Sequence, residues 1–381
     1  MQLQLPEPSA DARQASLALE KLIADDIRQQ DGWISFARYM ELALYAPGLG
    51  YYSGGAAKLG KDGDFTTAPE ITPLFGKTLA QIVQVLMQQS TAQLLEFGAG
   101  TGRLAFDILT EMKAGGVQVD SYAIVELSGE LRARQQQLLA DFPQVRWLDQ
   151  LPASFTGVVI GNEVLDAMPV HLVVKSGDGW LERGLALAND NFVYHDKPAA
   201  ERLTAQIPQQ EELPDGYMSE VHPASTAFMR SLAAMLNAGE KGAAILIDYG
   251  FPATEYYLPQ RDQGTLMCHY RHHSHPEPLY LPGLQDITAH VDFTTMARTA
   301  VEAGIDLLAY TSQAAFLLAA GLGEVLMRTA PTDAARYLPQ TNAVQRLTSP
   351  AEMGELFKVL VVGKGVEMPP EFARGDRSYR L

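Results

Sequence analysis

A chain of 381 residues is long enough for one large α/β domain with insertions or for two domains. Its formal net charge of −16 argues against a nucleic-acid-binding protein, because a phosphate backbone would be repelled, and would suit a basic protein partner. The single cysteine, Cys268, excludes an intrachain disulfide and fits a reducing compartment. No apolar run approaches the roughly 20 residues of a membrane span, and Glu7 and Asp11 precede the first arginine, unlike a secretory signal or mitochondrial presequence. We therefore expect a cytoplasmic protein.

The first ninety residues are predicted to be mainly helical. After a polar terminus of about 12 residues, the apolar periodicity predicts helices over 16–30, 35–44 and 72–89, with a glycine-rich loop through Gly63. We expect residues 1–90 to form a cap that contributes to the substrate and cofactor sites. Residues 91–381 would form the core domain, with insertions at about 171–220 and 251–292.

A strand–turn–helix junction follows at residues 94–103. In α/β proteins such junctions bind nucleotide-like cofactors. A dinucleotide site needs G-x-G-x-x-G, and Arg103 stands where the last glycine is required. The spacing E-x-G-x-G-x-G instead resembles motif I of the S-adenosylmethionine (SAM) methyltransferases, which implies that Glu96, Gly98, Gly100 and Gly102 bind the cofactor. The motif alone leaves an ordinary glycine-rich turn as the alternative.

The next two strands each end in an acid. Residues 121–127 form a short apolar strand with Glu126 at its end, followed by a helix over 132–139. A carboxylate there can accept both ribose hydroxyls of SAM or of NAD; the alternative is an acid at a helix N-terminus. The strand at 145–148 ends at Asp149, a candidate for the adenine amine, although Asp is also a common turn residue.

The fourth strand, residues 157–161, runs into a polar cluster of Asn162, Glu163, Asp166 and His171. Ligands in open α/β sheets bind beyond the carboxyl ends of the strands, so we expect this cluster at the cofactor crevice. Glu163 and Asp166 would share a face if a helical turn follows. The alternatives are a helix N-cap for Asn162, a surface acid for Asp166 and a partly buried histidine for His171.

The rest of the chain supplies further strands and a histidine-rich segment. Residues 171–175 and 179–183 predict a hairpin, with another strand at 191–194, and core strands are expected at 242–250, 306–310 and 357–362. Four histidines within 269–275 invite a metal site, but we favour a polar loop and predict no metal. His290 and Asp292 could pair or line a cleft; the alternative is that Thr288 and Asp292 cap the helix beginning at Phe293.

Six segments together resemble the MidA family of class I SAM-dependent methyltransferases, which includes the mitochondrial arginine methyltransferase that helps assemble respiratory complex I. They are residues 45–53, 63–71, 75–76, 96–102, 161–171 and 286–293. The resemblance, which extends from about residue 34 to 363, implies a Rossmann-like, seven-stranded, mostly parallel sheet with an N-terminal helical segment and a β-rich insertion. It also implies methyl transfer from SAM to protein arginine, with a respiratory complex subunit as one candidate acceptor.

An arginine acceptor requires acidic groups, because its guanidinium stays protonated at a pKa above roughly 12. Carboxylates can bind it bidentately and later accept a proton. Glu163 and Asp166 are the first candidates for this catalytic work, followed by Glu70 and then His171. Two alternatives stay open, namely a methyltransferase acting on lysine or a small molecule, and a SAM-binding assembly factor without catalysis.

Overall fold

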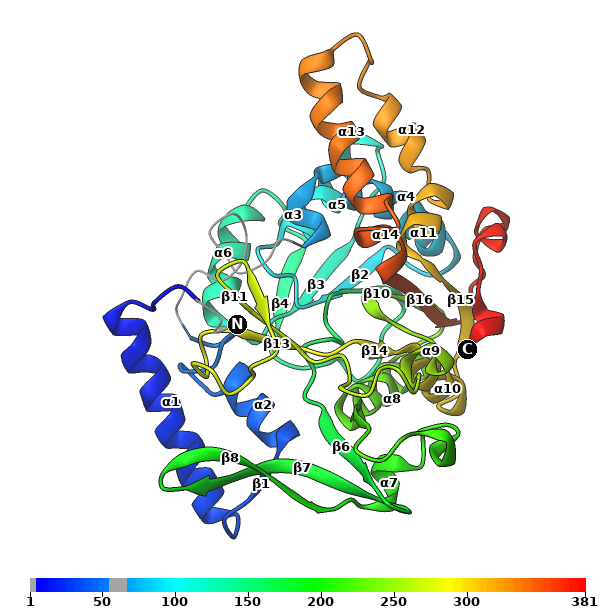
Figure 1. The fold of residues 1–381 in the computed structure, drawn as a ribbon. Coiled ribbons are helices and arrows are strands. Elements are labelled where there is room, and N and C mark those ends of the chain that lie inside the picture. Colours follow the sequence, from blue (N-terminus) through cyan, green and yellow to red (C-terminus); the bar gives the residue numbers. More distant parts are fainter. Residues whose placement is uncertain (1–4, 55–66) are drawn as a thin grey trace. The chain divides into compact units, whose positions relative to one another are not determined.

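The computed structural model describes residues 5–54 and 67–381 (Figure 1). The chain forms two compact units. The first unit comprises Met1–Phe65, Leu165–Ala227 and Phe251–Thr295, and the second comprises Thr66–Val164, Phe228–Gly250 and Met296–Leu381. The expected cap of residues 1–90, and the expected insertions into a core domain, stay predictions about the roles of these segments.

The second unit contains the predicted seven-stranded sheet, in the order β15-β16-β10-β5-β2-β3-β4 for the described residues. The strands are β2 (Gln93–Phe97), β3 (Ser121–Val125), β4 (Val145–Leu148), β5 (Gly157–Asn162), β10 (Gly242–Phe251), β15 (Asp306–Ser312) and β16 (Phe357–Lys364). The pairs from β10 to β4 are parallel, whereas β16 is antiparallel to both β10 and β15. The class I methyltransferase fold expected from the sequence is confirmed.

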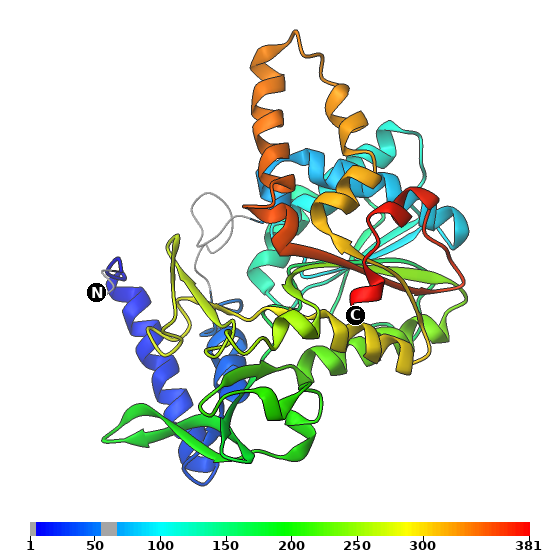
Figure 2. The ribbon, with the colours of Figure 1, turned by 45° about the vertical axis from the view of Figure 1, so that its right-hand side comes forward.

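Helices cover both faces of this sheet (Figure 2). On one face lie α4 (Pro73–Gln89) and α5 (Arg103–Ala114), and on the other lie α8 (Pro223–Ala238) and α10 (Phe293–Glu302). The central strands are therefore buried on both sides, which explains why Val158, Val159 and Ile160 of β5 follow one another without polar alternation.

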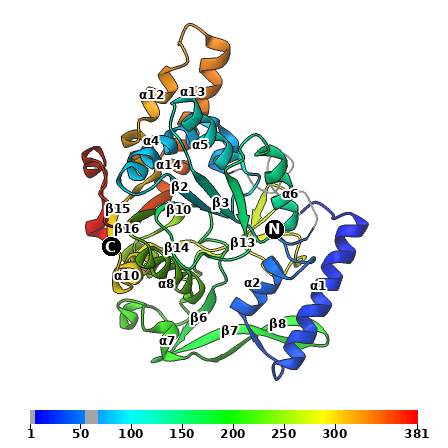
Figure 3. The same cartoon turned by 180° about the vertical axis from the view of Figure 1, so that it is seen from behind.

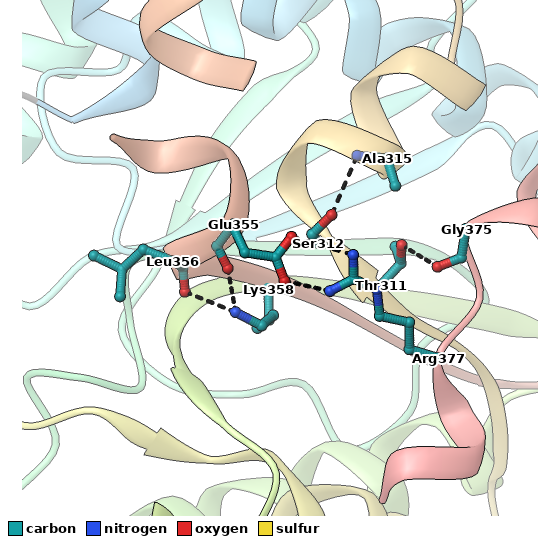
Figure 4. A network of polar contacts seen from close by, with 8 residues as sticks. All are labelled: Thr311, Ser312, Ala315, Glu355, Leu356, Lys358, Gly375 and Arg377. Atoms are coloured by element: carbon teal, nitrogen blue, oxygen red, sulfur yellow. Dashed lines mark hydrogen bonds and ion pairs between the residues drawn. The ribbon is translucent and has the colours of Figure 1, made fainter. Parts of the chain in front are cut away.

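The antiparallel edge of the sheet is held by polar contacts to the C-terminal segment (Figure 4). The guanidinium of Arg377 pairs with both carboxylate oxygens of Glu355, one of them at 3.1 Å. Thr311 of β15 donates a 2.6 Å hydrogen bond to the carbonyl of Gly375. Lys358 is 5% exposed, and its ammonium donates to the carbonyl of Leu356 at 3.2 Å. These contacts fix the strands farthest from the glycine turn.

A glycine separates two further helices of the second unit. The apolar segment at 314–327 forms two helices, α11 (Gln313–Ala319) and α12 (Leu322–Met327), separated at Gly321 by a φ of +90°. They precede α13 (Ala334–Thr348) and α14 (Met353–Leu356). No helix in the described residues is long and apolar enough to cross a membrane.

The first unit is built on an antiparallel sheet, β1-β7-β6-β9, with β8 paired to β7. Its elements are α1 (Ala10–Gln29), β1 (Ile34–Ser35), α2 (Phe36–Tyr45), β6 (His171–Ser176), β7 (Gly179–Ala188), β8 (Asn191–Pro198), α7 (Glu201–Thr204) and β9 (Met218–Val221). The predicted hairpin is confirmed, with Gly177 at a φ of +57° in its turn. The polar terminus is shorter than predicted, because Ser9 caps α1 by accepting from the N–H of Ala12 at 3.2 Å.

A three-stranded sheet in the first unit corrects the prediction of a loop at residues 269–275. The strands β11 (Met267–Tyr270) and β12 (His273–His275) form a hairpin, and β13 (Asp286–Thr288) pairs with β11. Arg271 and His272 make the turn with φ values of +47° and +63°. Pairing in the sheet leaves His275 1% exposed. Cys268 on β11 is fully buried, and burial raises the pKa of its thiol.

Candidate functional site

The glycine turn after β2 is shaped by three left-handed residues. Gly98, Gly100 and Gly102 have φ values of +57°, +56° and +87°, which side chains other than glycine adopt only with strain. Gly102 is also the N-cap of α5. A β-carbon at Gly102 would lie 3.2 Å from Cγ of Gln135, so this position has little room for a side chain. The left-handed backbone of the turn therefore explains why glycines recur at every second position here.

Glu126 lies beside this turn. Val125 pairs with Phe97, and the N–H of Gly98 donates to the carbonyl of Val125 at 3.1 Å, so the end of β3 adjoins the first glycine. One carboxylate oxygen of Glu126 accepts from the N–H of Ser128 at 2.8 Å, and the other accepts from the Gln135 carboxamide at 2.9 Å. Burial raises the pKa of Glu126, and these two hydrogen bonds oppose the rise. A carboxylate retains lone pairs for further donors.

Glu96, the acid of the glycine motif, is buried within the second unit. Its side chain is 2% exposed and accepts a 2.7 Å hydrogen bond from the hydroxyl of Tyr122 on β3. Burial raises the pKa of Glu96 to about 7, against the opposing effect of the Tyr122 bond, and the charge of Glu126 adds to the rise. Glu96 can therefore hold a proton near neutral pH in the absence of a bound cation.

Asp149 and Trp147 differ in their surroundings at the end of β4. Asp149 has a side chain that is 86% exposed and pairs with the Arg132 guanidinium of α6 (Gly129–Leu138) at 2.8 Å. Trp147, which the sequence did not single out, donates from its indole nitrogen to Oε1 of Gln135 at 2.9 Å. A contact of Asp149 with adenine stays a prediction.

Glu70 is connected to the glycine turn by a hydrogen bond from the hydroxyl of Thr101. It lies in the first turn of the short helix α3 (Ala68–Ile71). Of the motif that surrounds it in the sequence, residues 63–66 lie outside the described residues. The structure thus joins Glu70 to the predicted cofactor turn without assigning it a chemical role.

The segment after β5 does not form the helical turn that a shared face of Glu163 and Asp166 would require. Asn162 is the last residue of the strand, and its amide donates to the Glu163 carboxylate at 3.0 Å. Glu163 has a φ of +54°, which is incompatible with a helix, so Asn162 is no helix N-cap. The Oδ1 atom of Asn162 is buried and has no hydrogen-bond partner among the described residues. The backbone change removes the reason for placing Glu163 and Asp166 on one helix face.

Asp248, which follows the part of β10 (residues 242–247) that pairs with β5, was missed in the sequence. One of its carboxylate oxygens accepts from the N–H of Val164 at 3.1 Å, and the other accepts from its neighbour Tyr249 at 2.9 Å. The N–H of Glu163 donates to the carbonyl of Ile247 at 2.8 Å. The end of β10 therefore fixes the backbone on which Glu163 lies. The rule used for β5, that polar residues follow a parallel strand, would have found Asp248.

Asp166 and His171 belong to the first unit. Asp166 is 5% exposed in a turn over residues 165–168, and its carbonyl accepts from the N–H of Ala289 at 3.0 Å. On β6, Nδ1 of His171 lies 2.6 Å from the carboxylate of Glu182 on β7. His171 is therefore a partly buried histidine with a hydrogen-bonding partner, as the alternative interpretation expected.

His290 and Asp292 have separate partners in the first unit. Asp292 caps α10, accepting from the N–H and hydroxyl of Thr295 at 3.1 and 2.6 Å, which confirms that alternative for Asp292. Thr288 belongs to β13 and makes no cap; its hydroxyl donates to the carbonyl of Met267 at 3.4 Å. His290 stacks on Phe251 with ring centroids 5.2 Å apart. Within residues 5–54 and 67–381 no cluster of His, Cys, Asp and Glu could hold a metal ion.

The burial of Glu96 predicts a pH-dependent stability. Between its ordinary pKa of 4.5 and the folded value of about 7, only the folded state retains the proton, so the free energy of unfolding falls as pH rises through this window. Glu96→Gln removes the titration. We expect the stability of the variant relative to wild type to increase by about 1–3 kcal/mol between pH 5 and 8 in urea unfolding. Exposed Glu240→Gln is the control, and a pH-independent difference for Glu96→Gln would contradict the expectation.

Comparison with known proteins identifies the family. A crystal structure of a protein from Burkholderia thailandensis bound to S-adenosyl-homocysteine is 52% identical, with a TM-score of 0.94, and the match covers 99% of this chain and 100% of that one. The mitochondrial protein arginine methyltransferase NDUFAF7 homolog of Caenorhabditis elegans is 30% identical, over 81% of this chain and 78% of its own length. The mouse protein arginine methyltransferase NDUFAF7 is 29% identical over 86% and 80%.

The match to a family model agrees with these relatives. The model described as "Putative S-adenosyl-L-methionine-dependent methyltransferase" matches residues 74–311, which include the glycine turn, Glu126 and the end of β5. Over half of the chain is covered, in the region where the predicted cofactor residues lie. The chain belongs to this family of S-adenosyl-L-methionine-dependent methyltransferases.

Proposed function

We propose that this methyltransferase transfers the methyl group of SAM to an arginine side chain of a protein. The cofactor half of the proposal is carried by one observation: Glu126 lies directly beside a turn of three left-handed glycines at the carboxyl end of a parallel sheet. The arginine half is supported by the relatives named protein arginine methyltransferases, which are about 30% identical over most of the chain.

The residues at the turn suit SAM chemically. Gly98, Gly100 and Gly102 leave the backbone free of side chains, and Glu126 can accept from ribose hydroxyls. The buried Oδ1 of Asn162, which has no hydrogen-bond partner in the described chain, could accept a further donor from the ligand. We assign Glu96 to the methionine ammonium end, because a bound cation would favour its ionised form, and Asp149 to the adenine amine.

The chemistry divides between cofactor and protein. Bound SAM supplies an activated methyl group on a sulfonium. The protein must hold a guanidinium in line with that methyl and must receive a proton after transfer. We propose Glu163 of the second unit as a carboxylate that binds the guanidinium and localises its charge, and Asp166 of the first unit as a separate candidate for the same role. Glu70, bonded to Thr101, and His171, paired with Glu182, are the next candidates.

The nature of the acceptor follows from charge and relationship. A formal net charge of −16 favours a basic segment of a protein partner. A respiratory complex subunit is one candidate acceptor by family resemblance, and the cytoplasm is the compartment we propose. Incubating the protein with methyl-labelled SAM and a lysate of its host, and locating the label by mass spectrometry, tests the acceptor. Label on arginine is the expected result; label on lysine or on a small molecule would overturn the arginine assignment.

Replacing Glu126 tests the cofactor site. Glu126→Ala removes an ionised acceptor from the ribose, so we expect at least about a tenfold loss of S-adenosyl-homocysteine affinity in calorimetry, with an unchanged circular dichroism spectrum. Glu130→Ala, on the following helix, is the matched control and should bind like wild type. NAD should give no heat with any of the three proteins. Unchanged affinity in folded Glu126→Ala would show that the ribose is held elsewhere.

Replacing the proposed catalytic carboxylates separates an enzyme from a SAM-binding assembly factor. Glu163→Gln and Asp166→Asn keep shape and remove charge. Each should bind S-adenosyl-homocysteine within about threefold of wild type but lose roughly a hundredfold or more in transfer rate at saturating SAM. Glu240→Gln is the charge-matched control.

Wild-type rates in both variants would exclude these residues and leave Glu70 and His171 for the same test. Binding without transfer to any protein, by wild type itself, would favour the assembly factor.

A further inference from the structure

Gln135 lies at the meeting point of the elements that form the proposed cofactor site. It is on α6, which connects β3 to β4 in the chain, and its side chain is fully buried. Its Nε2 donates to the carbonyl of Gly100 at 2.8 Å and to the carboxylate of Glu126 at 2.9 Å. Its Oε1 accepts from the indole of Trp147 at 2.9 Å. One carboxamide thus connects the glycine turn, the end of β3 and β4.

The orientation of this carboxamide is fixed by its neighbours. The Gly100 carbonyl and the ionised Glu126 can only accept hydrogen bonds, and the indole N–H of Trp147 can only donate one. The amide nitrogen must therefore face the turn and the carboxylate, and the oxygen must face the indole. A glutamate, a methionine or a rotated amide would leave at least one buried polar group unpaired.

Gln135 also determines how closely the turn can approach α6. Its Cγ and Cα lie 3.2 and 3.4 Å from the place that a β-carbon on Gly102 would occupy. The glycine at 102 is therefore required by this contact with Gln135 as well as by its left-handed backbone. The glycine spacing and Gln135 form one packing arrangement.

The same contacts act on Glu126. Ser128 and Gln135 each occupy one side of its carboxylate, so the remaining lone pairs point in a fixed direction. Burial raises the pKa of Glu126, whereas the bond from Gln135 lowers it. The other charged groups facing Glu126 in the described chain are Arg132 of α6, which also lowers its pKa, and Glu96 of β2.

We infer that Gln135 is a positioning residue for the adenosine half of SAM: it holds the glycine turn and aims the Glu126 carboxylate at the ribose. The inference rests on the proposed use of Glu126 as the ribose acceptor. Gln135 acts on the ligand through Glu126 and the Gly100 backbone rather than by touching it. Its loss should therefore affect the recognition of the ribose hydroxyls specifically.

The first test compares S-adenosyl-homocysteine with its analogue lacking both ribose hydroxyls. In wild type we expect the hydroxyls to contribute at least about tenfold in calorimetric affinity. Gln135→Met should reduce that preference at least about threefold. Without its hydrogen bond from Gln135, the Glu126 carboxylate is no longer held toward the ribose, so the two residues are energetically coupled. Exposed Gln136→Met on the same helix should leave the preference as in wild type.

The second test uses the pH dependence, which a purely packing role would not change. Without the donor at 135, Glu126 takes up a proton at a higher pH, so the affinity of Gln135→Met should fall relative to wild type as the pH is lowered. Gln135→Glu retains the acceptor for Trp147 and places a second carboxylate beside Glu126. Its affinity should instead rise as the pH is lowered, when one shared proton restores a donor.

The outcomes separate this inference from the cofactor assignment. Wild type that binds no S-adenosyl-homocysteine would overturn both. Wild type that binds it, together with an unchanged hydroxyl preference and parallel pH profiles in folded variants, would overturn the role of Gln135 alone. If Gln135→Met does not fold, Gln135→Glu provides the test. Its affinity for S-adenosyl-homocysteine should rise as the pH falls, and only folded protein that binds the ligand can give this result.

Discussion

The parallel register of β2 and β3 is the constraint on which the site depends. Because Phe97 pairs with Val125, both strands end at the same level, and the Gly98 N–H bonds to the Val125 carbonyl. The glycine turn and Glu126 are thereby brought together although 23 or more residues separate them in the chain. Seen from behind, β2 and β3 run side by side, and α6 lies beyond their ends (Figure 3). A shift of this register would separate the turn from the carboxylate.

Buried polar side chains favour one arrangement of the residues around the glycine turn. Glu96 on β2 and Gln135 on α6 are at most 2% exposed, and each has hydrogen-bond partners on neighbouring elements. Removing a buried partner leaves a desolvated group unpaired, so each group favours a single arrangement of its neighbours. We interpret Glu96 and Gln135 as the groups that prepare the site before any ligand binds. Burial raises the pKa of Glu96, which means that burial disfavours the ionised form of this carboxyl.

The sequence was sufficient for the architecture, whereas the cofactor and catalytic roles assigned to the site residues stay predictions. Apolar runs and turn residues located β2 to β5, β10, β15 and β16, and the signal is strong for β2, β5, β10 and β16 because they are buried on both faces. The glycine spacing and Glu126 were recognisable because local backbone geometry and strand position determine them. Glu126 alone did not separate SAM from NAD, whereas the glycine spacing, with Arg103 where a dinucleotide site requires glycine, favoured SAM.

What the sequence missed depends on tertiary contacts. Gln135 stands in a polar run, Arg-Gln-Gln-Gln, in which only burial distinguishes it from Gln136 and Gln137. The left-handed backbone of Glu163 is fixed by hydrogen bonds from Glu163 and Val164 to β10, which is distant in the sequence. The residues around Glu163 alone therefore could not decide whether a helical turn follows β5. The histidine-rich segment 269–275 has no alternating apolar pattern, yet β11 pairs with both β12 and the distant β13.

A crystal structure of the protein with S-adenosyl-homocysteine tests the central claim most directly. The account predicts that the ribose hydroxyls lie within hydrogen-bond distance of the Glu126 carboxylate, while Gln135 keeps its bonds to Gly100, Glu126 and Trp147. A ligand bound away from the glycine turn, or a ribose held by other residues with Glu126 turned aside, would contradict it.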